Sequence, residues 1–120
     1  MDFGKNIYLV MERGYLAYHK QILTALEHST ADIIFFCEHD VLYHKSHFDF
    51  VPKRKDVYYY NLNNWRWGYP SEIAVRYDGL TSLSQLCAVR ELVLKHFKAR
   101  QRKMREIGME KFQKKDPYQA

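Results

Sequence analysis

The chain of 120 residues has the length of a single domain, and its 47% hydrophobic and 28% charged residues are ordinary for a globular fold. No apolar run approaches the ~20 residues that cross a bilayer, so we expect no transmembrane segment. The net charge of +5 is confined to one segment, since residues 90–115 hold ten Lys or Arg and three Glu. This distribution argues against a nucleic-acid binder that is basic throughout.

The two cysteines indicate a reducing compartment. Cys37 and Cys87 both lie in apolar stretches, and neither belongs to a C-x-x-C pair. This spacing argues against a cysteine-based zinc site, and buried free thiols are typical of a reducing environment. No signal-peptide pattern precedes the first apolar run. We therefore expect a cytoplasmic protein.

The first third of the chain predicts a strand, a helix and a second strand. Residues 7–11 are a short apolar run. Along 15–28, apolar residues recur at steps of three and four, as on one face of an amphipathic helix: Tyr15, Tyr18, Ile22 and Leu26. The run 32–37 is short, β-branched and aromatic, which favours a strand buried on both faces. This order predicts a βαβ unit with two parallel strands.

The middle of the chain predicts irregular structure followed by strands. Residues 41–52 suggest a short helical turn plus loop, and 57–62 a further strand. Residues 65–67 and 73–77 flank the turn signature Gly68-Tyr69-Pro70-Ser71, which predicts a hairpin.

A last long helix is expected near the C-terminus. Ser82 or Ser84 would cap its start, and Gly108 and Pro117 mark its end. Its apolar stripe is Leu86, Val89, Val93 and Phe97.

Together these elements predict a small α/β fold of the Rossmann-like kind. We expect a mixed sheet with a mostly parallel core and a hairpin, flanked by two main helices, of which the second is long and basic. The predicted domain covers residues 1–98, and 99–120 form a basic helical extension.

An acidic cluster, Glu38-His39-Asp40, follows the second predicted strand. Ligands of parallel α/β sheets bind at the carboxyl ends of strands. Carboxylates at i and i+2 can reach one cation if the turn bends, and Mg²⁺ or Mn²⁺ takes one or two carboxylates plus substrate phosphates. Such a metal stabilises charge on a leaving diphosphate. His39 or His44 would add a ligand or a hydrogen bond to phosphate.

Residues 31–48, A-D-I-I-F-F-C-E-H-D-V-L-Y-H-K-S-H-F, resemble the D-x-D stretch of GT-A-type glycosyltransferases, with E-x-D in its place. The whole likeness, to family-two-like members, covers residues 3–97. It implies a GT-A-like fold and transfer of a sugar from a nucleotide-diphosphate donor to an unknown acceptor. The implied metal ligands, for Mn²⁺ or Mg²⁺, are Glu38, Asp40 and His44. The implied nucleotide-sugar ligands are Glu38, His39, Asp40, Trp65 and Arg66.

Other residues have two interpretations each. Trp65 and Trp67 share one strand face. This face could be a stacking wall for a sugar or base, or it could be packed in the core, and we favour core packing. Asp78 is a candidate general base or a turn residue. Glu91 is a second candidate base, or pairs with Lys95 on its helix.

Three alternatives stay open. Members of the family that the chain resembles usually carry a preceding β-α-β portion and a late acidic or histidine motif. Neither is seen in this sequence, where the segment after Glu91 is basic. A catalytically incomplete binding module is therefore one alternative. A transition-metal hydrolase site of His39, His44 and His47 with the two acids is another, although its spacing matches no motif. The run 95–115 could bind nucleic acid or anionic lipid, and self-association would cover an exposed sheet edge.

Overall fold

The computed structural model describes residues 4–108, which divide into two compact units. One unit contains residues 4–30 and 93–108, and the other contains residues 31–92. No helix among these residues is long and apolar enough to cross a membrane.

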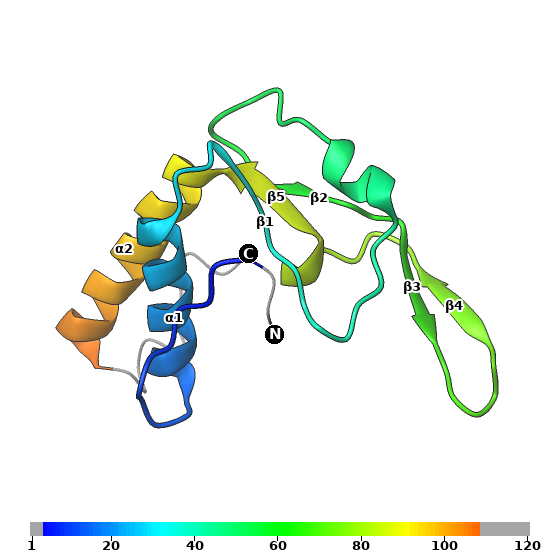
Figure 1. Ribbon diagram of the computed structural model, residues 1–120, viewed down its shortest axis with the longest axis horizontal. Helices are drawn as coiled ribbons and strands as arrows, with labels where there is room; N and C mark the ends of the chain where they lie inside the picture. Colours follow the sequence, from blue (N-terminus) through cyan, green and yellow to red (C-terminus); the bar gives the residue numbers. More distant parts are fainter. Residues whose placement is uncertain (1–3, 109–120) are drawn as a thin grey trace. The chain divides into compact units, whose positions relative to one another are not determined.

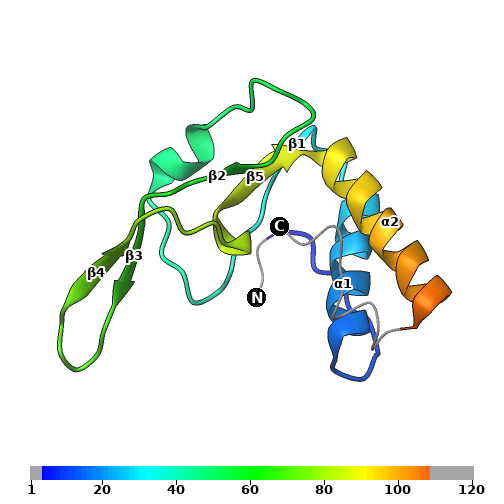
Figure 2. The same cartoon turned by 180° about the vertical axis from the view of Figure 1, so that it is seen from behind.

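The first unit is built on two helices, α1 (Tyr15–His28) and α2 (Arg90–Ile107), with the first turn of α2 in the other unit. The helices lie side by side (Figures 1 and 2), and the His19 ring of α1 lies 5.5 Å from the Phe97 ring of α2. The Arg100 guanidinium covers the same ring at 4.8 Å. The side chains buried in this unit are Ala17, His19, Leu23, Leu26, Val93, Phe97, Arg100 and Met104.

The predicted helix 15–28 is confirmed, and so is the helix end at Gly108. Gly108 has a φ of 82° and donates its N–H to the Met104 carbonyl at 3.0 Å, which is how glycine commonly closes a helix. Pro117 lies outside the described residues.

The predicted βαβ unit is wrong. Residues 7–11 form no strand, and most of their side chains are exposed. A five-residue apolar run becomes a strand only where a partner strand pairs with it, and none of the described strands does so.

The second unit holds a three-stranded antiparallel sheet in the order β1-β5-β2 (Figure 1). The strands are β1 (Ile33–Phe35), β5 (Leu86–Val89) and β2 (Tyr59–Tyr60). Ile34 pairs with Ala88, and Tyr60 pairs with Leu86. Leu86, Cys87 and Ala88 are the buried centre of this unit.

This sheet overturns the predicted Rossmann-like, GT-A-like fold with a mostly parallel core. Every strand pair within residues 4–108 is antiparallel. The run 32–37 contains a strand, but β1 is a half-buried outer strand. The central strand is β5, which was expected to be helix because Leu86 and Val89 are three residues apart. Four consecutive apolar residues instead suit a strand that lies between two neighbouring strands and is covered on both faces.

The hairpin and the helical turn agree with the sequence, whereas the start of the last helix does not. The hairpin is confirmed as β3 (Asn64–Trp67) paired with β4 (Ala74–Tyr77), a separate two-stranded sheet. The helical turn is η1 (Lys45–Asp49). The predicted helix start at Ser82 or Ser84 is wrong, because a second turn, η2 (Leu83–Gln85), leads there into β5, and α2 begins only at Arg90.

Candidate functional site

The acidic cluster lies on a tight turn just after β1. The Glu38 carbonyl accepts the Val41 N–H at 3.3 Å, which closes a four-residue turn. The side chains of Glu38, His39 and Asp40 are all exposed. The backbone therefore turns between Glu38 and Asp40, as it must if both carboxylates are to reach one cation. Both side chains are exposed and accessible to a ligand. We call residues 38–41 the acidic turn.

Tyr43 ties the acidic turn to the rest of its unit. Its hydroxyl accepts the Glu38 N–H at 3.1 Å and donates to the Ser84 carbonyl at 2.8 Å. Burial raises the pKa of Tyr43, so the phenol keeps the proton that it donates. Burial also raises the pKa of the Cys37 thiol, against a hydrogen bond with Tyr43 that lowers it. The acids therefore stand on a fixed backbone beside a neutral thiol.

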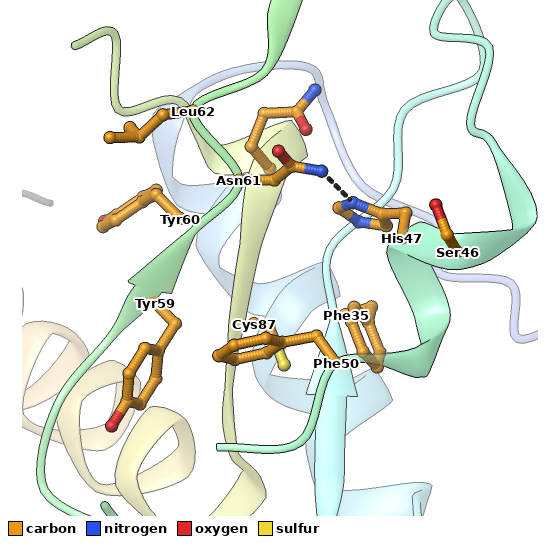
Figure 3. Close-up of a pocket in the computed structure, with 10 residues that line it drawn as sticks. Phe35, Ser46, His47, Phe50, Tyr59, Tyr60, Asn61, Leu62 and Cys87 are labelled. Carbon is orange, nitrogen blue, oxygen red and sulfur yellow. Dashed lines mark hydrogen bonds between the residues drawn. The ribbon is translucent and has the colours of Figure 1, made fainter. Parts of the chain in front are cut away.

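A cavity of about 460 Å³ lies in the same unit, within the size range of small-molecule sites. Figure 3 shows Phe35 of β1 and Tyr59 of β2 along its wall, with His47 of η1 at one edge. We call this cavity the aromatic pocket. Its lining residues are Phe35, Ser46, His47, Phe50, Tyr59, Tyr60, Asn61, Leu62, Gln85 and Cys87.

Hydrogen bonds at one edge of the aromatic pocket determine which ring nitrogen of His47 carries the proton. The Asn61 Oδ1 accepts the Asn63 N–H at 3.0 Å, so its amide nitrogen faces His47 and donates to Nδ1 at 3.0 Å. The neutral ring then carries its proton on Nε2, which is buried without a hydrogen-bond partner among the described residues. Burial lowers the pKa of His47, in agreement with the neutral form.

Ring contacts connect the pocket edge with the acidic turn. The His47 ring lies 4.9 Å from Tyr43 and 5.5 Å from Phe35. Tyr43 bonds to Glu38, so one aromatic ring separates the acidic turn from the pocket wall. The Tyr43 and His47 rings therefore connect the acidic turn with the edge of the aromatic pocket.

The buried His47 predicts a loss of stability in mild acid. Because its pKa is lower in the folded chain than in the unfolded one, the unfolded chain binds the proton more readily. The stability that it contributes is complete above the unfolded pKa of about 6.5 and is lost as the pH falls toward the folded value. We expect urea denaturation to give a lower free energy of unfolding at about pH 5 than at about pH 7.5.

Replacing His47→Gln should reduce this difference. It should not abolish the difference, because burial and the neighbouring Arg100 and Lys95 also lower the pKa of His96. An equal difference in the wild type and the variant would contradict the role given to His47.

His44, predicted as a third metal ligand, instead caps η1. Its Nδ1 accepts the Ser46 N–H at 3.2 Å and lies 2.8 Å from the Ser46 hydroxyl. Within residues 4–108, no three His, Cys, Asp or Glu side chains gather where they could hold a metal ion. The acidic turn thus supplies two carboxylates and no third ligand, and the alternative hydrolase site is not assembled.

The other predicted residues lie on other elements. Trp65 and Arg66 are on the hairpin, and Asp78 follows β4, where it pairs with Arg76 at 3.3 Å. Glu91 is exposed in the first turn of α2. Core packing of the tryptophans is wrong, since Trp65 is 54% and Trp67 is 64% exposed.

The residues of the site that were not singled out by the sequence include Tyr43, Asn61 and Gln85. The aromatic run that ends in Asn61 was a usable signal, because a strand of tyrosines followed by an amide gives stacking surfaces and a polar edge. Tyr43 gave no local signal, since its partner Ser84 is 41 residues away.

We compared the chain with protein-family models, curated proteins and solved structures, and none of them matches it. The chemistry of the site therefore carries the functional assignment.

Proposed function

We propose that the chain binds a nucleotide-diphosphate sugar together with Mn²⁺ or Mg²⁺ and acts as a glycosyltransferase that passes the sugar to an acceptor. The observation that supports this most is the position of the acidic turn. It presents two exposed carboxylates one aromatic ring away from a pocket of small-ligand size.

Two carboxylates without a third protein ligand suit Mg²⁺ or Mn²⁺. These ions usually take one or two carboxylates and complete their shell with substrate phosphates and water, whereas a structural zinc site takes four protein ligands. Glu38 and Asp40 would hold the ion. When bound, it supplies Lewis-acid stabilisation of the charge on the leaving diphosphate.

The aromatic pocket suits the ring parts of the same ligand. Phe35, Phe50 and Tyr59 offer apolar ring surfaces for stacking. Asn61 keeps a second amide hydrogen and Gln85 a side-chain amide, which are suited to polar edges. The neutral His47 adds no charge at the wall. A flat ring with a hydrogen-bonding edge, joined to a diphosphate, matches the two halves of the site.

Asp78 and Glu91 are the proposed bases for the acceptor hydroxyl. Each has an exposed carboxylate, and a base must reach within hydrogen-bond distance of the proton that it takes. Their position on elements other than the acidic turn favours a second candidate function, a module that binds the donor without turnover. Hydrolysis or transfer of the bound sugar separates the two.

Three further proposals concern surroundings and partners. Cys37 and Cys87 are free thiols, and the exposed position of Cys37 supports a reducing, cytoplasmic compartment. The sheet edges at β1 and β2 support self-association. The exposed cations of α2 support weak contact with anionic surfaces: Lys95, Lys98, Arg102, Lys103 and Arg105.

Isothermal titration calorimetry tests the proposal. UDP- and GDP-sugars are titrated into the chain with Mn²⁺ and again with EDTA, and the nucleoside monophosphates serve as controls. We expect Mn²⁺-dependent binding of at least one nucleotide-diphosphate sugar and much weaker binding of the monophosphates. Absence of metal-dependent binding throughout the series would overturn the proposed function.

A further inference from the structure

The hairpin exposes aromatic side chains that no part of the proposed site uses. Figures 1 and 2 both show it extending away from the β1-β5-β2 sheet. Its exposed large residues are Trp65, Trp67, Tyr69, Ile73, Val75 and Tyr77. A two-stranded hairpin has no core of its own, so exposed rings concentrated there indicate a binding surface.

Strand register places both tryptophans on one face. Trp65 pairs with Arg76, and Trp67 pairs with Ala74. Side chains two residues apart share a face and lie about 7 Å apart along a strand. We call Trp65, Trp67, Ala74 and Arg76 the tryptophan face. The small Ala74 side chain leaves the ring beside it uncovered.

Local contacts hold both indoles. The Trp65 Nε1–H donates to the Asn63 Oδ1 at 2.8 Å. The Trp67 ring lies 6.3 Å from the Tyr69 ring, inclined by 56°. With its one polar group engaged, Trp65 offers its ring surface and no donor. A platform fixed before binding loses little entropy when a ligand stacks on it.

The charge of the hairpin argues against nucleic acid as its ligand. Residues 62–80 hold two arginines and two acids, a net charge of zero. Arg76 pairs with Asp78, and Arg66 lies 5.1 Å above the Tyr77 ring on the opposite face. Affinity for nucleic acid depends on cations that neutralise phosphates, and this surface offers no excess of cations.

A neutral ligand with one apolar face and polar edges suits this surface. The C–H face of a pyranose carries slightly positive hydrogens, which an aromatic ring attracts through its negative face. Its hydroxyl groups can bond to the neighbouring amide of Asn63 and to Arg76, which lies on the same face.

We propose that the tryptophan face binds a neutral saccharide, with its sugar rings stacked on Trp65 and Trp67. The binding itself needs neither nucleotide nor metal. If the proposed function holds, on which this last step rests, the saccharide is the acceptor class.

Tryptophan fluorescence tests the proposal directly, because Trp65 and Trp67 are the only tryptophans in the chain. Neutral tetrasaccharides of glucose, mannose and N-acetylglucosamine are titrated without nucleotide or metal. We expect at least one to shift or quench the emission with a saturable curve. Trp67→Ala should weaken that binding about tenfold, the loss of one ring contact, as measured by calorimetry. Trp67→Phe should retain most of the affinity.

Val75→Ala is the matched control, since Val75 lies on the opposite face of the same hairpin, and it should bind as the wild type does. Circular dichroism confirms that each variant folds. No emission change with any of the three saccharides would overturn the proposal. The proposal would also be overturned if the emission changed only with an RNA oligomer, in a salt-dependent way, or only with the concentration of the protein itself. Because metal and nucleotide are absent, these results do not depend on the donor site.

Discussion

Replacing Leu86 with alanine is expected to lower the free energy of unfolding by about 2–4 kcal/mol. Leu86 is 1% exposed and lies on β5, the strand that pairs with both β1 and β2. Truncation removes buried methyl groups and leaves a cavity in the centre of the unit. Small domains are stable by only about 5–15 kcal/mol, so this loss is a large fraction of the total.

Leu42→Ala is the control for this measurement, because Leu42 is 101% exposed. The same truncation at that position should change the free energy of unfolding by less than about 0.5 kcal/mol. Urea denaturation followed by circular dichroism gives both values. Similar losses in the two variants would contradict the central position of β5 and the burial of Leu86.

Replacing Asp40→Asn is expected to weaken Mn²⁺-dependent binding of the nucleotide-diphosphate sugar by about a hundredfold. Even groups behind a metal ligand cost roughly 10–100-fold when removed, and the amide keeps the size of the side chain but removes its charge. Glu38→Gln should have a comparable effect. The double variant should lose less than the product of the two losses, because both acids serve one cation.

Asp49→Asn provides the matched control. Asp49 is exposed on η1, in the same unit as the acidic turn, and its replacement should leave the affinity unchanged. Calorimetry with Mn²⁺ measures all four variants, and denaturation should show near-wild-type stability because Glu38 and Asp40 are exposed. Binding that persists in Asp40→Asn would contradict the assigned metal site.

Elements that depend on local signals were predictable. The helix 15–28 followed from its period, and the hairpin followed from the turn around Gly68 and Pro70. The three-stranded sheet was not predictable in the same way. β1 pairs with a strand more than 50 residues later, and nothing local in 32–37 specifies that partner or its direction.

The helical period also misled where it had two interpretations. Leu86 and Val89 suit one helix face as well as a buried strand, and the sheet decides between them. In α1 the expected apolar face included Leu26, which is buried, and Tyr18, which is exposed, whereas His19 and Leu23 are buried without having been expected on that face. A period indicates a helix, but the burial of each face depends on what packs against it.

The same distinction applies to the tryptophans. Alternation around Arg66 correctly placed Trp65 and Trp67 on one face, but it did not say that the face is uncovered. The favoured interpretation, core packing, assumed a second layer that the described residues do not provide. Their exposure therefore favours a role for Trp65 and Trp67 in ligand binding over a role in core packing.

The position of the acidic turn was predicted correctly, but for a reason that the structure contradicts. The sequence placed Glu38-His39-Asp40 after a strand, which is correct. The expected reason was the carboxyl edge of a parallel sheet, and the sheet is antiparallel. Its actual support is Tyr43, which joins the turn to η2 at Ser84, a contact between distant parts of the chain that sequence alone does not specify.

Nuclear magnetic resonance with Mn²⁺ tests the central claim most directly. The bound ion broadens signals of nearby nuclei, so it reports its own position in the wild-type chain. With UDP- or GDP-sugar present, we predict that the amide signals of residues 38–41 and Tyr43 broaden first, and that omitting the nucleotide sugar greatly weakens the effect. Broadening centred on other acids, such as Asp56 or Asp78, or broadening that is independent of the nucleotide sugar, would contradict a metal-diphosphate site at the acidic turn.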